Sequence, residues 1–269
     1  MTNRASGPCA ESRKWFTHFS LRSMTALHVS SNAVLQLTEE ERRAITPSIQ
    51  QFQLGEGSRG QRLFERGEKY GQSVNDSIFA EALDALIREE QQHSRYLAAF
   101  MESQSIARVQ KHWVDTVFRK LRGLAGLELS LTVLVTAELI AVPYYRALRG
   151  ATGSAILKMI CNRILDDEAN HLKFQASMLA RVASGRPSAL RHALGEMHRL
   201  FLLGTMIIVW IEHCDVFHAA GYTFPQFKSE TLLEFREFSA ARANHGKQRT
   251  AAEKSGIRNL RRVQRETQM

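Results

Sequence analysis

Apolar residues recur at intervals of three and four over most of the chain, which is the spacing of one face of an α-helix. No run alternates apolar and polar residues between turn residues, so strand patterns are nearly absent. We therefore predict an all-α fold. The predicted helices span about 39–71, 77–103, 112–149, 155–183 and 188–218, and a short region follows Gly221.

Two of these helices carry polar residues on their apolar faces. The helix expected over 77–103 has Glu90 and His93 in register with its apolar stripe. The helix expected over 155–183 has Glu168 and His171 in the same relation to its own stripe. The E-x-x-H spacing places a carboxylate and an imidazole on one helix face, where both can reach one metal pair. Two such motifs in register with apolar stripes predict a metal site in the core.

The turns between the helices predict two further ligands. Residues at the same height in an antiparallel helix pair lie symmetrically about the connecting turn. Glu138 mirrors Glu168 through residue 153, and Glu56 mirrors Glu90 through residue 73. Both acids also lie on apolar stripes, so we predict that all four carboxylates converge.

Four carboxylates in a dry core could not all stay ionised without compensating charge. Two divalent cations balance four carboxylates, and mixed carboxylate and imidazole ligation without thiolates favours iron or manganese over a structural zinc. The predicted metal ligands are Glu56, Glu90, His93, Glu138, Glu168 and His171.

The order Glu56, Glu90-x-x-His93, Glu138, Glu168-x-x-His171 resembles the ferritin-like di-iron carboxylate superfamily, over roughly residues 40–180. The resemblance implies a ferritin-like four-helix bundle with one or more additional C-terminal helices. The extra helices make the chain more similar to the oxygenases of that superfamily, including the amine N-oxygenase group. That group carries a further His one turn before its last E-x-x-H, where this chain has Ile164.

The resemblance implies an oxidoreductase that uses two Fe, or Mn in their place, to activate O₂ and oxidise a small organic substrate, with electrons from an external donor. Two alternatives stay open at this point. One is a ferroxidase or peroxide-scavenging protein, although the C-x-x-C pairs of a rubrerythrin-like peroxidase are missing. The other is a non-enzymatic helical bundle that metal ions stabilise.

The formal net charge of +9 belongs to the two ends, because residues 25–239 are neutral as a whole. Such ends are typical of solvated tails, and no nucleic-acid-binding motif accompanies them, so we expect no nucleic-acid partner. We predict a flexible polar lead over 1–37, a ferritin-like helical domain over 38–239 and a disordered basic tail over 240–269. Both ends are expected to be dispensable for metal binding.

Three widely spaced cysteines predict neither a disulfide framework nor a thiolate zinc site. Residues 123–145 have the length of a membrane span, but they carry two acidic residues, which favours a buried helix. The apolar run 200–211 is shorter than a span and is read as a fifth core helix. We expect a cytoplasmic protein without a membrane span, for which a homodimer is one candidate assembly.

Other polar residues receive structural interpretations. Glu128 is predicted to form a salt bridge with an arginine, and Tyr144 and Tyr145 are predicted to fill the core. Four histidines on or beside the fifth helix are predicted to be surface or capping residues because no E-x-x-H partner accompanies them: His192, His198, His213 and His218.

Overall fold

The computed structural model describes residues 8–27, 36–124 and 126–267. These ranges form α1 (Pro8–Ser23), α2 (Glu39–Glu56), α3 (Gln61–Ser73), α4 (Phe79–Ser103), α5 (Trp113–Leu124), α6 (Leu127–Gly150), α7 (Ala155–Val182), α8 (Ser188–Ala219) and α9 (Phe224–Thr267). No strand occurs within the described ranges, so the all-α prediction is confirmed.

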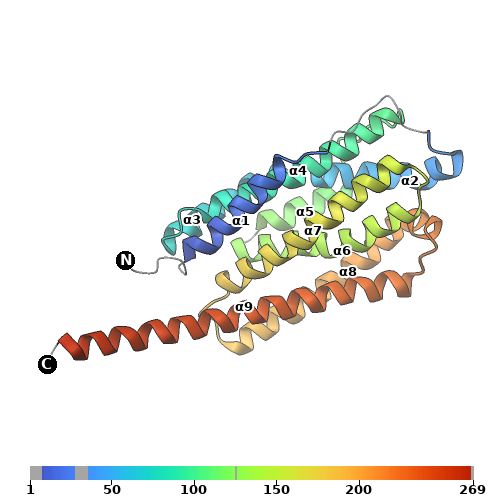
Figure 1. The fold of residues 1–269 in the computed structure, drawn as a ribbon. Helices are drawn as coiled ribbons and strands as arrows, with labels where there is room; N and C mark the ends of the chain where they lie inside the picture. The colour runs from blue at the N-terminus through green and yellow to red at the C-terminus, as the bar shows by residue number, and fades with distance from the viewer. Residues whose placement is uncertain (1–7, 28–35, 125, 268–269) are drawn as a thin grey trace.

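The helices that carry the predicted ligands are neighbours. Helix α2 packs on α4, α4 packs on α7, and α7 packs on α6 (Figure 1). The remaining helices lie outside this set: α1 packs on α4, α8 on α2 and α6, and α9 on α6 and α7. The apolar core therefore surrounds the faces that carry the predicted ligands.

The helix predicted over 39–71 is two helices. Helix α2 begins after Thr38, whose side chain and that of Glu41 form a reciprocal capping box, and it ends at Glu56. Helix α3 begins after Gly60, which has a φ of +60°. A β-carbon there would lie 2.4 Å from Ile87 Cδ1, so this turn requires glycine.

The helix predicted over 112–149 is also two helices. The short amphipathic helix α5 packs on α6, and α6 begins at Leu127 after Gly126. Residue 125 lies outside the described ranges. The separation places α5 beside α2 and α6 instead of extending the core helix.

Residues 8–23 of the predicted flexible lead over 1–37 form α1. Trp15 and Phe19 are buried because they lie four residues apart on the face that packs on α4. Residues 1–7 and 28–35 lie outside the described ranges.

Residues 240–267 of the predicted disordered tail over 240–269 form the C-terminal part of α9. Helix α9 continues through the predicted domain boundary at 239, with Phe238 buried just before it. Arg242, beyond the boundary, lies 3.5 Å from Glu128 of α6. Residues 268–269 lie outside the described ranges.

Two described helices, α6 and α8, are long and apolar enough to cross a membrane by length and composition. Helix α6 lies mostly inside the protein, as a core helix does. Helix α8 is only partly a core helix: Leu202 and Met206 are buried, whereas Leu200 and Ile211 are about two-thirds exposed.

Candidate metal centre

The six predicted ligands meet in the core. They form two overlapping groups whose ligand atoms lie within 4.8 Å of one another: Glu56, Glu90, His93 and Glu168 in one, and Glu90, Glu138, Glu168 and His171 in the other. The groups share Glu90 and Glu168. This arrangement suits two cations side by side, with the shared carboxylates between them and one imidazole for each.

Each ligand occupies a position that the helical pattern imposes. Glu56 is the last residue of α2, one face of which is buried at Ile45 and Ile49. His93 and His171 are fully buried on α4 and α7, and Glu138 and Glu168 are nearly so. Glu90 is the most open of the six, with 14% of its side chain exposed.

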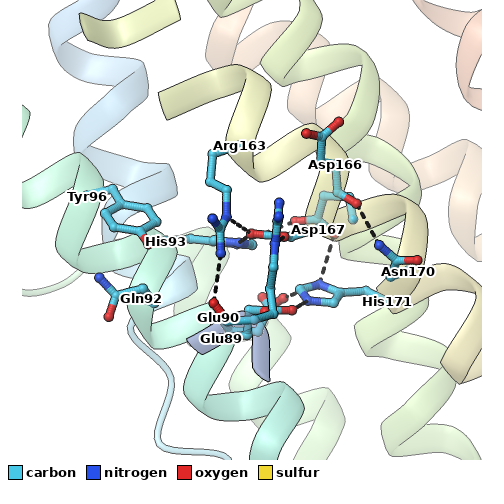
Figure 2. A network of polar contacts seen from close by, with 12 residues as sticks. Glu89, Glu90, Gln92, His93, Tyr96, Arg163, Asp166, Asp167, Asn170 and His171 are labelled. Atoms are coloured by element: carbon cyan, nitrogen blue, oxygen red, sulfur yellow. Dashed lines mark hydrogen bonds and ion pairs between the residues drawn. The ribbon is translucent and has the colours of Figure 1, made fainter. Parts of the chain in front are cut away.

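Both imidazoles are held from outside the cluster. Nε2 of His93 lies 3.2 Å from Asp167 Oδ2, and Nε2 of His171 lies 2.8 Å from Glu89 Oε2 (Figure 2). The Nδ1 atom of each ring therefore faces the other ligands: Nδ1 of His171 lies 2.7 Å from Glu90 Oε1. A carboxylate on the outer nitrogen fixes the tautomer and orientation of a metal-binding histidine.

Asp167 is itself held by two arginines. Arg163 Nε lies 2.9 Å and Arg22 Nε lies 2.5 Å from its carboxylate oxygens. Burial acts to raise the pKa of Asp167, but the hydrogen bonds from His93 and these arginines outweigh it and lower the pKa to about 2. Asp167 is therefore a carboxylate over the whole physiological pH range.

Two of the carboxylates accept hydrogen bonds from neighbouring helices. Tyr145 donates its hydroxyl proton to Glu56 Oε1 at 2.7 Å, and the amide of Gln175 donates to Glu138 Oε1. Each bond occupies one oxygen of its carboxylate and thereby orients the other.

The acids are under strong electrostatic strain in the absence of cations. Burial raises the pKa of Glu138 well above its usual range, and the carboxylates of Glu168 and Glu90 add to the effect. Burial likewise raises the pKa of Glu90. For His93, burial acts to lower the pKa, but the surrounding carboxylates outweigh it and raise the pKa well above its ordinary value. Protons thus supply positive charge that bound cations would otherwise supply.

Several ligand atoms are buried without a hydrogen-bond partner among the described residues. They are His93 Nδ1, Glu138 Oε2, both carboxylate oxygens of Glu168, and the two atoms Glu90 Oε1 and His171 Nδ1, which contact each other only as an ion pair. Leaving such groups unpaired in a protein interior is costly. Because the predicted ligands account for six of the eleven buried side-chain atoms without a hydrogen-bond partner in the described part of the chain, the cluster fits a metal site.

No family model matches the chain, and neither a curated protein nor a solved structure matches it. The interpretation of the cluster therefore depends on its own geometry. That geometry establishes buried Glu and His groups that could hold metal ions.

A cavity of about 610 Å³ opens beside the cluster. Four ligands contribute to its wall: Glu56, Glu90, Glu138 and Glu168. Apolar residues of α4, α6 and α8 also contribute to the wall, among them Ile87, Val133 and Val209. Ala137 of α6 is exposed only one residue before a ligand, and it also lines the cavity.

The sequence pattern missed the residues that hold the ligands. Glu89 and Asp167 each precede the Glu of an E-x-x-H motif, so the acidic pair in Glu89-Glu90 and Asp167-Glu168 was the available signal. Tyr145 was predicted only to fill the core, but its hydroxyl binds Glu56. Gln175 had no distinguishing pattern.

The surface interpretation is wrong for two histidines of α8. His198 and His213 are buried, where they contact the hydroxyls of Thr136 and Ser48 respectively. Neutral histidines with such partners are compatible with a core. The predicted salt bridge of Glu128 is confirmed, with Arg186 Nη2 at 2.6 Å.

Proposed function

We propose that this chain is a ferritin-like di-iron oxidoreductase, with manganese as the alternative metal, that activates O₂ to oxidise a small organic substrate. The observation that carries the proposal is the apolar cavity that reaches four of the six ligands. A site that only bound and oxidised iron would need room for small ions, whereas this cavity has the volume of a pocket for an organic molecule.

The protein side chains would prepare the site as follows. Glu56 and His93 would hold one cation and Glu138 and His171 the other, and Glu90 and Glu168, which belong to both groups, could serve either. A pair of bound ferrous ions supplies the capacity to bind and reduce O₂. Reduction of O₂ to water takes four electrons, so a two-electron oxidation of the substrate requires two more from an external donor.

The surrounding residues control the protons and the water. Asp167 and Glu89 keep the outer nitrogens of the imidazoles protonated, so the inner nitrogens remain available as ligands. Tyr145 fixes the orientation of Glu56, and the apolar wall of the cavity excludes water from the space in front of the carboxylates. Only Glu90 is appreciably open to that space.

Metal content tests the ligand assignment. Protein produced in iron-rich medium should contain about two metal ions per chain by elemental analysis. Glu138→Gln removes a ligand charge and should lower that content, whereas Glu128→Gln, a matched change on the same helix, should leave it unchanged. Equal metal content in both variants would refute the assignment.

A second experiment tests the reaction. Protein loaded with ferrous iron is incubated with O₂, a chemical reductant and decanoate or indole, and oxidised products are identified by mass spectrometry. Ala137→Phe fills the cavity, so it should abolish product while keeping the metal. Chelation of the iron should abolish product in the wild type. Repeated oxidation of added ferrous iron with mineral formation and no organic product would support a ferroxidase instead.

A further inference from the structure

The cavity has two chemically different ends. Its buried end is formed by the acidic ligands, and its exposed end carries basic side chains from the α2–α3 turn, from the start of α3 and from α5: Arg59, Arg62, Arg119 and Lys120. Between them the wall is apolar, with Leu63, Ile87 and Leu134 buried around it. The basic end is hereafter called the mouth.

The mouth has excess positive charge. Arg119 is neutralised by Asp115, whose two carboxylate oxygens lie 2.8 and 2.7 Å from its Nε. Arg59, Arg62 and Lys120 have no ion-pair partner among the described residues. Three cations thus face solvent at the entrance to an apolar space.

The backbone adds to this positive potential. Helix α3 begins at the mouth, and Gly60, Gln61 and Arg62 all line the cavity. Its N-cap residue Gly60 provides no side-chain cap, and its first turn contains no acidic residue. The free N–H groups at a helix N-terminus attract anions. At the other end of the cavity, Glu138 and Glu168 contribute nearly fully buried carboxylates to the wall, so the two ends differ in charge.

We propose that the cavity binds an amphipathic anion, with its apolar body against the inner wall and its carboxylate or phosphate head group at the mouth. This inference rests on the proposed function, because it names the substrate class for the same site. The polarity of the cavity sets the orientation: carboxylate ligands repel an anionic head from the inner end, and the basic mouth attracts it. The apolar body is therefore the part that approaches the metal ligands.

Calorimetric binding of three ten-carbon probes to the full-length, iron-loaded protein tests this. Decanoate and decyl phosphate should bind roughly tenfold more tightly than decanol, and the preference should shrink at high salt. The stronger of the two anions identifies the head group, and either order supports the proposal. Decanol binding as tightly as both anions would overturn it.

Variants locate the two halves of the site. Arg62→Ala and, separately, Lys120→Met should each weaken binding of the anions about fivefold and leave decanol unaffected. Arg43→Ala, an exposed arginine on α2 that does not line the cavity, is the matched control and should change neither. Ala137→Phe should weaken all three probes. Unchanged anion binding in both mouth variants would refute the inference.

The two proposals fail separately. Absence of both iron and manganese from the purified protein would refute the proposed function even if decanoate bound at the mouth. Equal binding of decanol and decanoate would refute the anion site even if the iron-loaded protein oxidised an organic compound.

Discussion

At the scale of single residues, the candidate site depends on side chains that are not ligands themselves but hold the ligand histidines in place. Asp167 does not face the ligand groups, yet it holds His93 and is held in turn by Arg22 and Arg163. Glu89 holds His171 in the corresponding way. Adjacent residues of a helix point about 100° apart. In each acidic pair, therefore, Glu90 or Glu168 points toward the cluster, and the preceding residue, Glu89 or Asp167, contacts the outer nitrogen of a histidine on the neighbouring helix.

Asp167→Asn tests this positioning role. Loss of the carboxylate should weaken metal binding by about 10- to 100-fold, because His93 loses the partner that fixes its tautomer. Competition with a chelator of known affinity measures the change. Asp166→Asn alters the exposed neighbouring acid and serves as the control. Similar losses in the two variants would show that net charge, and not the contact with His93, governs the affinity.

At the scale of the elements, periodicity was sufficient to predict three of the long helices. The predicted helices 77–103, 155–183 and 188–218 correspond closely to α4, α7 and α8. A turn that leaves the spacing of the apolar residues unchanged cannot be detected from periodicity. The turn at Gly60 between α2 and α3 was therefore not predicted. The mirror relation still found Glu56, because it depends on the turn at 71–76 and on α4. Helix α1 was missed because its segment is polar as a whole and buries only two large hydrophobic side chains, Trp15 and Phe19.

Phe19 tests whether α1 belongs to the folded body. Its ring packs edge-on against His171 at a centroid distance of 5.7 Å, and it is 1% exposed. Phe19→Ala should lower the free energy of unfolding by roughly 3–5 kcal/mol, as expected for a buried phenylalanine. Phe16→Ala, on the same helix but 36% exposed, should cost much less. Urea denaturation compares the two, and equal costs would contradict the packing of α1.

This packing also changes the expectation for the N-terminal end. Residues 1–24 were expected to be dispensable on the basis of charge. Arg22 of α1 binds Asp167, and Phe19 covers His171, so removal of α1 would expose one side of the candidate metal centre. Composition could not reveal this, because the contacts join residues more than 140 positions apart.

At the scale of the whole molecule, the buried histidines of α8 make stability depend on pH. Burial lowers the pKa of His198 to about 4, and the charge of Arg242 adds to the effect. The same residue titrates near 6.5 in the unfolded chain. Between these values the unfolded state binds more protons, so the contribution to stability is complete above pH 6.5 and is lost as the pH falls toward 4.

His198→Gln should reduce this dependence. Glutamine can still donate to Thr136, but it does not titrate. The metal-loaded wild type should therefore lose up to about 3 kcal/mol more stability than the variant between pH 6.5 and 4. Denaturant titrations at several pH values measure the difference. If the free energy of unfolding depends on pH in the same way for the two proteins, His198 has the same pKa in the folded and unfolded states, which contradicts the prediction.

The contacts of Glu89 with His171 and of Asp167 with His93, each between α4 and α7, bear on the origin of the molecule. The segment with α2 and α4 supplies Glu56, Glu90 and His93, and the segment with α6 and α7 supplies an equivalent trio. Each segment, however, relies on the other for the carboxylate that steadies its imidazole, since Glu89 serves His171 and Asp167 serves His93. Neither half is chemically complete alone, but two copies of either half about a twofold axis would complete each other. Such reciprocity is what a small helical hairpin would leave behind if it had first worked as a pair and later been duplicated and joined into one chain.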